Sequence, residues 1–503
     1  MSSRAPALVI TQILQAQRES GLEWVMDDSA TWISTQFAGA ALGDIRRTRR
    51  AIQIASQMVA RPGASLPQLA PSRSDLKATY ALWRSPMSRP EHLQAGHRGQ
   101  VRAALEDGTD PVLLIEDTTV MSWAGSAPVA GLGPIGGGGD AGLQGFLLHT
   151  VLAVRWAAAP PPTSARRPPV ELLGVADQQY HVRAPAPPEE TALPEGSQAF
   201  ARQRRWRESA LWSESTAHLG PAPAAGPRWV RICDRGADVF EFLAGCVAAG
   251  HGYVVRAAQD RVVDAGDAGG RLFARLRAAP PLACLTLELR ARPRRPARVA
   301  ALHVAATSVE LRAPHRPGAA AGRRPGVACT ALRVWEPDAP ADAGPLEWLL
   351  LSDAAVATAA DAITLVQQYA TRWVIEEYHK VLKTGLGAER LQLEEARRLF
   401  AAIAVMSVVA VRLLQLKEWV RAAPEAPADA AGLTPLELRL LMLHTNRPLP
   451  TVGDVALALG RLGGHLNRTR DGLPGWRTLW RGIQRLHAMA EGAALVLEAK
   501  SFG

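Results

Sequence analysis

The chain has 503 residues, of which 48% are hydrophobic, and it carries a formal net charge of +10 with a pI near 10.0. This length exceeds one ordinary hydrophobic core, so we expect roughly two to four domains. The apolar fraction excludes an intrinsically disordered chain. The positive charge makes nucleic acid the first candidate partner, and a charge bias without a partner is the alternative.

Cysteine content and hydropathy indicate a cytoplasmic protein. The four cysteines have no spacing suited to zinc, and four thiols in so long a chain suit a reducing compartment. The first 20 residues lack the apolar core and cleavage site of a signal peptide. Because no run of about 18 apolar residues is free of charge, we expect no transmembrane helix and no membrane partner.

The N-terminal region, residues 1–95, is predicted to be a helical domain that binds DNA ends. Asp44 is placed to cap a helix whose first turns are strongly basic, with Arg46, Arg47 and Arg49 as candidate DNA contacts. A solvated basic helix would have the same pattern, so both interpretations remain open for these three arginines.

Strands and helices then alternate, which predicts an α/β catalytic domain over residues 96–421. We expect strands at 111–115, 146–156, 170–176, 229–233, 253–255 and 347–352, and helices at 196–216 and 237–248. The stretch at about 257–345 has short apolar runs among Arg, Pro and Ala and is predicted to be a β-rich insertion. A linker-like break at 422–433 opens a helical C-terminal domain that extends to residue 503.

One helix combines a core-packing face with a polar face. If residues 362–384 form a single helix, Tyr369, Arg372, Glu376, Lys380 and Lys383 fall within an arc of about 80°. Five apolar side chains cluster on the opposite side: Val374, Ile375, Tyr378, Val381 and Leu382. The alternative is a solvated face with two i,i+4 ion pairs of Glu376, each worth about 0.3–0.5 kcal/mol.

Two aspartates extend this helix face into a candidate metal site. Asp117 and Asp234 each follow an apolar strand, at the sheet edge where α/β enzymes place their active sites. Together with Glu376 they could share two Mg²⁺ ions about 4 Å apart, which would activate a nucleophile and stabilise the leaving oxygen of a phosphodiester. Asp234 could instead be a turn or helix-capping residue.

The motifs resemble the DDE transposases of the insertion-sequence-four family, and among them those of the Tn-five type. The family spacing Tyr-x₂-Arg-x₃-Glu-x₆-Lys is met by Tyr369, Arg372, Glu376 and Lys383. Further similar segments occur in the family's order along the chain: ALGDIRRTRR (41–50), IEDTT (115–119), ICDRGAD (232–238), RWVIEEYHKVLKTGLGAER (372–390), VAVRLLQL (409–416) and RLGG (461–464). The regions 257–345 and 422–460 diverge from the family.

The resemblance implies a ribonuclease-H-like catalytic core. Asp117, Asp234 and Glu376 would bind two Mg²⁺ ions, with Mn²⁺ able to substitute. Three side chains would contact phosphates near the cleaved end, assisted by Lys380: Tyr369, Arg372 and Lys383.

The resemblance also implies a base-flipping platform and a reaction path. Trp348 would stack on a base flipped out of the transposon end, with Arg256 contacting DNA nearby; a core tryptophan is the alternative for Trp348. DNA would be cleaved, closed into a hairpin, reopened and joined through its 3′ end to a target. The implied partners are double-stranded DNA, comprising inverted-repeat ends and target, and a second copy of the chain on paired ends, in a bacterial cytoplasm at the nucleoid.

Two other features carry no chemistry in this interpretation. The glycine-rich run 131–139 lacks a GKS or GKT ending and is expected to be a flexible loop. His149 lies in an apolar strand and is expected to be a hydrogen-bonded core histidine. Two alternative functions remain open: a metal-dependent nuclease of the same fold without strand transfer, and a non-catalytic, domesticated DNA-binding protein.

Overall fold

The computed structural model describes residues 29–124, 128–135, 143–156, 168–184, 189, 192–194, 197, 206–264, 270–289, 297–314, 325–340, 346–468 and 471–501. Some predictions therefore lie wholly or partly outside the described residues. They concern the first 20 residues, the glycine run from residue 136 onward, and residues 196 and 198–205 of the helix expected at 196–216.

A group of helices forms the N-terminal part of the described chain. Its members are α2 (Ser29–Ala38), α3 (Ile45–Ala60), α4 (Leu66–Leu69), α5 (Arg73–Arg84), α6 (Pro90–Leu93) and α7 (Ala95–Glu106). Asp44 caps α3 as predicted, because its side chain accepts a hydrogen bond from the Arg46 backbone N–H. Ile54, Met58 and Val59 of α3 are buried, so one face of this basic helix packs inward.

A large mixed sheet follows, with strand order β2-β3-β1-β5-β6-β12-β11-β10-β7-β8, β4 beside β3 and β9 beside β10. Its first half comprises β1 (Val112–Ala124), β2 (Gly133–Pro134), β3 (Leu143–Arg155), β4 (Glu171–His181), β5 (Trp229–Cys233) and β6 (Gly252–Arg256). Its second half comprises β7 (Val262–Asp264), β8 (Gly270–Arg271), β9 (Ala283–Leu289), β10 (Arg298–Leu311), β11 (Val327–Trp335) and β12 (Glu347–Ser352). Helices α10 (Ala210–Leu219), α11 (Phe240–Ala248) and α12 (Leu272–Ala278) connect these strands.

The centre of the sheet is parallel. β5 pairs with β1 on one side and β6 on the other in parallel register, and all five of its residues are buried. Buried parallel strands have nearly continuous apolar sequences, and β5 has its predicted bounds. β12, which is antiparallel to both of its neighbours and buried over its last four residues, also has its predicted bounds. Strands β7 to β11 occupy the region expected to be β-rich, and Gly133–Pro134 of the glycine run pair with β3 rather than forming a loop.

β1 is longer than the sequence suggested. The prediction ended this strand before Asp117, but β1 continues to Ala124 and pairs with β3 throughout. What ends near Asp117 is the parallel pairing with β5, whose last register pair joins Glu116 to Cys233. The β-branched residues Thr118, Thr119 and Val120 favour this extension, because their side chains suit an extended backbone.

The helix expected at 362–384 is in fact three consecutive segments. α13 (Ala359–Ala370) ends at Thr371, α14 (Trp373–Lys380) begins after Arg372, and Val381–Gly385 form a π-helical turn. A short 3₁₀ turn follows at Ala388–Arg390. Thr371 and Arg372, which join α13 to α14, keep helical backbone angles.

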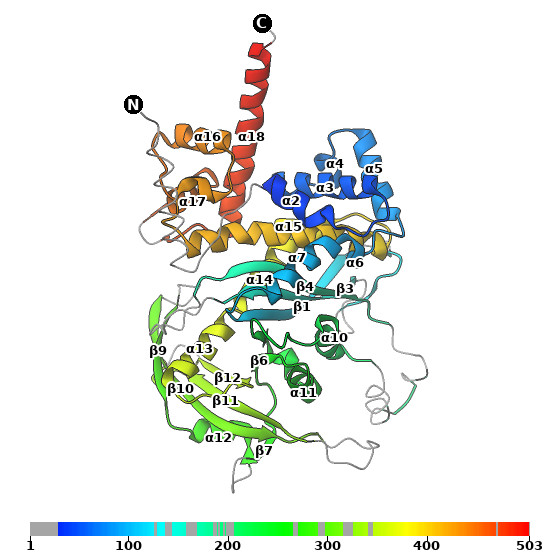
Figure 1. Ribbon diagram of the computed structural model, residues 1–503. Coiled ribbons are helices and arrows are strands. Elements are labelled where there is room, and N and C mark those ends of the chain that lie inside the picture. The colour runs from blue at the N-terminus through cyan, green and yellow to red at the C-terminus, as the bar shows by residue number, and fades with distance from the viewer. Residues whose placement is uncertain are drawn as a thin grey trace.

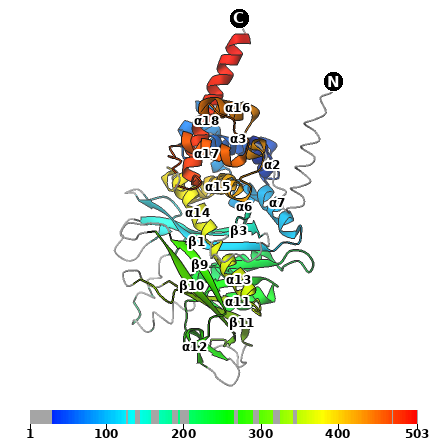
Figure 2. The ribbon, with the colours of Figure 1, turned by 90° about the vertical axis from the view of Figure 1, so that its left-hand side faces the viewer.

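The last α-helices of the described residues are α15 (Ala396–Ala422), α16 (Pro435–Thr445), α17 (Val452–Leu462) and α18 (Trp476–Ser501). α15 is long and apolar enough to cross a membrane by length and composition, but 89% of its apolar window is buried inside the fold. It lies between the sheet and an upper layer made of the N-terminal helices and α16 to α18 (Figure 1). From the upper layer α18 projects away from the sheet (Figure 2).

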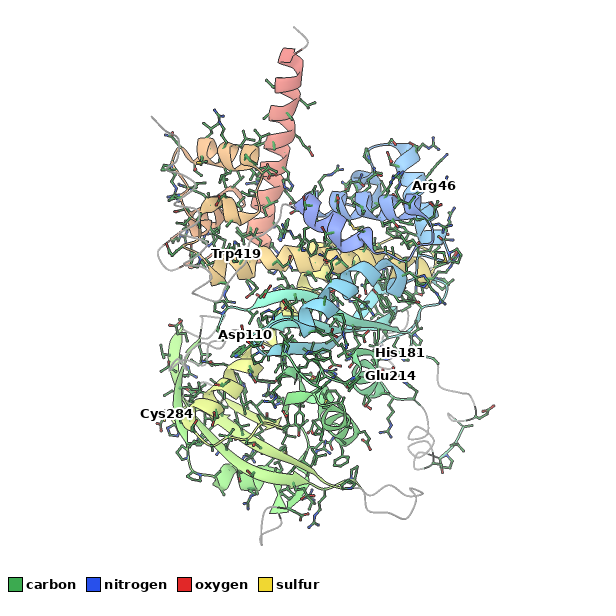
Figure 3. All side chains as sticks on the ribbon, viewed as in Figure 1. Arg46, Asp110, His181, Glu214, Cys284 and Trp419 are labelled. Atoms are coloured by element: carbon green, nitrogen blue, oxygen red, sulfur yellow. The ribbon has the colours of Figure 1, made fainter. Side chains whose placement is uncertain are left out.

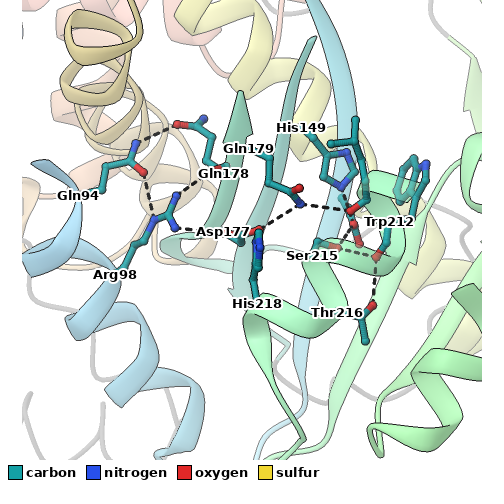
Figure 4. A network of polar contacts seen from close by, with 12 residues as sticks. Gln94, Arg98, His149, Asp177, Gln178, Gln179, Trp212, Ser215, Thr216 and His218 are labelled. Atoms are coloured by element: carbon teal, nitrogen blue, oxygen red, sulfur yellow. Dashed lines mark hydrogen bonds and ion pairs between the residues drawn. The ribbon is translucent and has the colours of Figure 1, made fainter. Parts of the chain in front are cut away.

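A polar seam fixes the N-terminal helices to the sheet. Arg98 of α7 contacts the Asp177 carboxylate of β4 at 3.1 Å and donates to the Gln178 carbonyl at 3.0 Å. Gln94 donates to the Gln178 side chain at 2.9 Å (Figure 4). Because Gln94 and Gln178 are buried, the last N-terminal helices are held against the edge strand β4 in a defined position.

Candidate active site

The sheet topology brings Asp117 and Asp234 together. Parallel β1 and β5 are in register up to Glu116 and Cys233, so the next residues on each strand are the two aspartates. Asp234 also caps the 3₁₀ turn Arg235–Ala237, since its Oδ1 accepts from the Gly236 N–H at 2.8 Å. The capping alternative considered for Asp234 is therefore real, and it fixes this carboxylate beside β1.

Asp117 lies among like charges in a mostly buried position. Burial raises its pKa, the negative charge of Asp234 raises it further, and Glu376 adds a smaller contribution. Arg372 and a hydrogen bond from the Thr118 N–H oppose this, and the net result raises the pKa of Asp117 to about 6. The three predicted carboxylates thus interact electrostatically at one place, although they come from β1, β5 and α14.

Arg372 lies between two of these carboxylates. Its Nη1 is 3.5 Å from Asp117 Oδ2, and its Nη2 donates to Glu376 Oε1. The i,i+4 ion pair between Arg372 and Glu376 is therefore present, as expected if this helix face were simply solvent-exposed. The added contact to Asp117 shows that this face of α14 is turned toward the sheet rather than toward bulk water.

The opposite face of the helix is buried as predicted. All five apolar side chains on that face are at most 1% exposed: Val374, Ile375, Tyr378, Val381 and Leu382. This packing fixes the rotation of α14 about its axis, so Glu376 is aimed at β1 by the core beneath it.

Tyr369 differs from the prediction because it is buried rather than displayed on the polar face. It is 5% exposed and meets Trp348 edge-on, with ring centroids 5.8 Å apart. Burial raises the pKa of its phenol, against the lowering effect of the nearby Arg372 and Arg256 guanidinium groups. Tyr369 belongs to α13, which ends at Ala370, whereas Glu376 belongs to α14.

Trp348 and Arg256 lie next to this phenol on neighbouring strands. Trp348 is the second residue of β12, is half-buried, and packs against the main core. Arg256 ends β6 opposite Leu350, and its Nη2 donates to the Glu347 carbonyl at 3.3 Å. The structure therefore brings Tyr369, Trp348 and Arg256 together beside the carboxylates.

The two lysines take different positions. Lys380, the last residue of α14, is exposed. Lys383 donates to the Val120 carbonyl at 2.7 Å and pairs with Glu389 at 3.2 Å. Glu389 also accepts from both the N–H and the hydroxyl of Ser122 at 2.9 Å, so Lys383 is attached to the far part of β1. Sequence reasoning did not identify Glu389, and its place in the family segment 372–390 was the available signal.

A basic cavity of about 280 Å³ opens beside Arg256. Its lining residues are Arg235, Arg256, Ala257, Ala258, Phe273, Arg277, Glu347 and Leu349. The Glu347 carboxylate accepts from Arg277 Nη2 at 2.9 Å and from Arg333 Nε at 2.9 Å. Positive charge exceeds negative charge here. Sequence reasoning missed Arg235, Arg277 and Arg333 because arginine is frequent throughout the chain.

The donor set fits a hard divalent cation in its chemistry and charge. Burial is the main cause of the raised pKa of Asp117, and the charges of Asp234 and Glu376 add to it, so the three carboxylates lie within electrostatic range of one another. Within the described residues no three His, Cys, Asp or Glu side chains are close enough to hold one metal ion. The carboxylates therefore converge without forming a closed ligand set, and Arg372 provides the balancing charge.

The predicted arginines of the N-terminal region lie on α3, in the upper layer (Figure 3). The Arg46 side chain is 85% exposed and pairs with Asp44. Arg49 is exposed as well, whereas Arg47 donates to the Leu42 carbonyl at 2.9 Å and is half-buried. Arg46 and Arg49 are thus available to a large partner, and Arg47 is partly used within the fold.

His149 is a core histidine with hydrogen-bond partners at both ring nitrogens, as predicted. It is fully buried, and its two ring nitrogens lie 2.7 Å from Thr118 Oγ1 and from Glu116 Oε1. The four cysteines are free thiols, and Cys284 is the exposed one.

Comparison with known proteins gives two matches, at opposite ends of the chain. Residues 29–87 match a family described as transposase DNA-binding. Residues 408–502 match the Tn5 transposase dimerisation domain. The first match spans α2 to α5, including Arg46 and Arg49. The second runs from within α15 to the end of α18. The carboxylates lie in the sheet and helices between the two matched segments.

Proposed function

We propose that this chain, a Tn5-like transposase by both of its matched terminal domains, is a metal-dependent enzyme that cuts DNA at transposon ends and joins the 3′ ends to a target. The observation that carries the proposal is the convergence of Asp117, Asp234 and Glu376 between a transposase DNA-binding domain and a Tn5 dimerisation domain. We assign the sheet that holds them to the ribonuclease-H-like class. The enzyme would act in the bacterial cytoplasm, at the nucleoid.

Asp117, Asp234 and Glu376 would hold two Mg²⁺ ions, or Mn²⁺ in their place. Such ions lower the pKa of a bound water or 3′-hydroxyl and stabilise the leaving oxygen in an in-line displacement. The chain's own contribution is to hold the carboxylates on rigid elements. β1 and β5 fix the two aspartates through register, and the buried face of α14 fixes Glu376.

Arg372 has a second task in this proposal. Its guanidinium balances Asp117 and Glu376 in the absence of metal ions. Once cations neutralise the carboxylates, the same guanidinium is available for a scissile phosphate, which it can grip in bidentate fashion. Lys383, attached to β1, and the exposed Lys380 would extend this phosphate-binding surface.

Trp348, Tyr369 and Arg256 form the proposed platform for a flipped base. Trp348 is held edge-on by the buried Tyr369, so its ring is fixed while part of its surface remains open. A fixed aromatic face offsets the stacking that a flipped base loses, worth about 1–3 kcal/mol per base. Hairpin formation needs such a platform, whereas simple hydrolysis does not.

Two copies of the chain would assemble on paired ends through the C-terminal region. The match to the Tn5 dimerisation domain covers α18, which projects from the fold (Figure 2). α18 exposes the apolar side chains Leu495 and Val496 on this projecting part. Exposed apolar side chains on a projecting helix suit packing against a helix of a second copy.

The test compares wild type with Glu376→Gln on a plasmid that carries the inverted repeats flanking its gene, with Mg²⁺. Wild type should release the intervening DNA, and Glu376→Gln should lose cleavage by at least about 10³-fold while its gel-shift affinity for end DNA stays within about twofold. Glu288→Gln, the same change at an exposed position of β9, is the matched control and should cleave normally.

Each alternative function gives a different outcome. Cleavage without joining of any 3′ end to target DNA would favour the nuclease. End binding by wild type without cleavage in Mg²⁺ or Mn²⁺ would favour a domesticated DNA-binding protein. Survival of cleavage in Glu376→Gln would refute the carboxylate assignment.

A further inference from the structure

A charged cluster is buried directly behind Asp117. Glu116, His149, Ser215 and Arg231 each have an exposed fraction of 0%. The Glu116 carboxylate is held by Arg231 Nη2 and the Ser215 hydroxyl, and Arg231 Nη1 donates to Thr216 Oγ1 at 3.0 Å. Figure 4 shows the histidine ring of β3 directed at α10, where Ser215 and Thr216 lie.

His149 binds the residues on either side of Asp117. Successive side chains of a strand point to opposite faces, so Glu116 and Thr118 lie on one face of β1 and Asp117 on the other. The imidazole reaches both flanking residues, with Nε2 at 2.7 Å from Glu116 Oε1 and Nδ1 at 2.7 Å from Thr118 Oγ1. It therefore bridges the backbone segment from which the Asp117 carboxylate projects.

The directions of these hydrogen bonds are mutually consistent. The Glu116 carboxylate pairs with the buried guanidinium of Arg231 and also contacts the Ser215 hydroxyl and His149 Nε2. An ionised Glu116 only accepts, so Nε2–H of His149 donates to it. Nδ1 then accepts from the Thr118 hydroxyl, which fixes the tautomer and the orientation of the ring.

Trp212 packs against both His149 and the turn that holds Asp234. Trp212 of α10 meets His149 edge-on, with centroids 4.8 Å apart. The indole also lies against Gly236, where a Cβ would sit 3.2 Å from Trp212 Cζ2 and 3.0 Å from Asp234 Oδ1. Trp212 of α10 thus contacts both the histidine behind Asp117 and the turn that holds Asp234.

A stabilising role explains this cluster poorly. Burying an ion pair costs desolvation, and apolar residues of similar volume are often as stable or more stable in its place. Unlike apolar packing, the cluster makes directional hydrogen bonds to both sequence neighbours of Asp117. Groups that orient metal ligands from behind typically contribute 10–100-fold to metal affinity or activity.

We propose that His149, anchored by Glu116 and Arg231, is a positioning residue that holds Asp117 in its metal-binding orientation through the Thr118 hydroxyl. This inference rests on the proposed function. It assigns His149 no contact with DNA, substrate or metal. Its role is to restrict the β1 backbone, so that the Asp117 carboxylate reaches the cations without reorganisation.

The test removes one hydroxyl and leaves the strand intact. Thr118→Val keeps the shape and β-branching of Thr118 but deletes its bond to His149, and Thr118→Ser keeps the bond. The matched control is Thr330→Val in β11, which deletes another part-buried hydroxyl bond, to the Ala354 carbonyl at 2.8 Å. Each protein is assayed for Mn²⁺ binding by electron paramagnetic resonance without DNA, for end cleavage, and for thermal unfolding.

Thr118→Val should weaken Mn²⁺ binding and slow cleavage about tenfold or more, with a melting temperature close to that of Thr330→Val. Thr118→Ser should recover most of both losses, and Thr330→Val should bind Mn²⁺ as wild type does. In a His149→Ala background, Thr118→Val should add little, because the shared bond is already gone.

The inference is overturned if Thr118→Val binds Mn²⁺ within about twofold of wild type. It is also overturned if Thr118→Ser is as impaired as Thr118→Val. Failure of wild type to bind Mn²⁺ or to cut DNA would refute the proposed function and this inference together. Normal metal binding by both wild type and Thr118→Val would refute the inference alone.

Discussion

Asp117→Asn should stabilise the metal-free protein while abolishing cleavage. Burial and the charges of Asp234 and Glu376 raise the pKa of Asp117 to about 6, against an ordinary value of 3.8. Because the folded state favours the protonated acid, ionised Asp117 destabilises the fold. A shift of about 2 units corresponds to about 3 kcal/mol at pH values above both pKa values.

The sign of this effect sets its pH dependence. Below pH 4 the carboxyl is protonated in folded and unfolded chains alike, so the charge penalty is absent. The penalty grows as pH rises from about 4 to 6 and is constant above that range. Asparagine can still accept the bond from the Thr118 N–H, so the substitution removes the charge and leaves this contact in place.

The assay is thermal unfolding of both proteins without metal at pH 4.5 and pH 8. Asp117→Asn should melt above wild type at pH 8, and the gap should shrink at pH 4.5. Mg²⁺ should raise the melting temperature of wild type more than that of the variant, since ligands stabilise the state that binds them. A variant less stable than wild type at pH 8 would refute the reasoning.

A matched control removes a carboxylate whose pKa is shifted the other way. Backbone and side-chain hydrogen bonds from Thr358 hold the pKa of Asp361 below its usual range. Asp361→Asn should therefore destabilise the protein at pH 8, with the loss shrinking as pH falls through the lowered pKa. Stabilisation by both substitutions would indicate a general effect of net charge instead of a local one at Asp117.

Three further predictions concern the ends of the chain and the base platform. Arg46→Ala should weaken gel-shift binding to end DNA and reduce the slope of log affinity against log salt by about one, and an unchanged slope would argue against a phosphate contact. Trp348→Ala should slow hairpin formation more than first-strand nicking on denaturing gels; equal slowing would remove the platform role. Burial alone lowers the pKa of His487, but bonding to Glu437 outweighs it and raises the pKa, so this pair stabilises fully below pH 6.5 and less as pH rises. His487→Ala should therefore lower the melting temperature more at pH 6 than at pH 9, and equal losses would contradict the pairing.

Local sequence pattern predicts those elements whose burial is uniform. β5 is buried throughout and β12 over its last four residues, and apolar runs marked the positions of both strands. The apolar face of α14 was predicted for the same reason, and with it the direction of Glu376. Residues whose environment is formed by distant segments of the chain were harder to predict from the sequence. Arg231 occupies a strand position with 0% exposure, where its charge is compensated by Glu116 on β1 and by hydroxyls on α10.

The sequence did not predict the register of β1 against β5 or the interruption of the helix at Thr371. Nothing local indicates that β1 runs on to Ala124 while its pairing with β5 stops at Glu116, yet that offset places Asp117 beside Asp234. Nor does anything local indicate that the helix is interrupted at Thr371, or that Tyr369, which precedes the interruption, is buried. Both are tertiary effects, set by which strands and helices pack together.

The position of Arg372 links the metal-free structure to the proposed chemistry. A guanidinium that contacts Asp117 and Glu376 lowers the repulsion among three carboxylates, which otherwise disfavours their convergence. Cations in the same place would serve that purpose better, because two divalent ions carry four charges. In the proposed reaction, binding of the ions and release of Arg372 toward phosphate would be one exchange of counter-charges. Arg372→Ala should consequently lower the stability of the metal-free protein and reduce cleavage even at saturating Mg²⁺, whereas a purely structural ion pair predicts only the first loss.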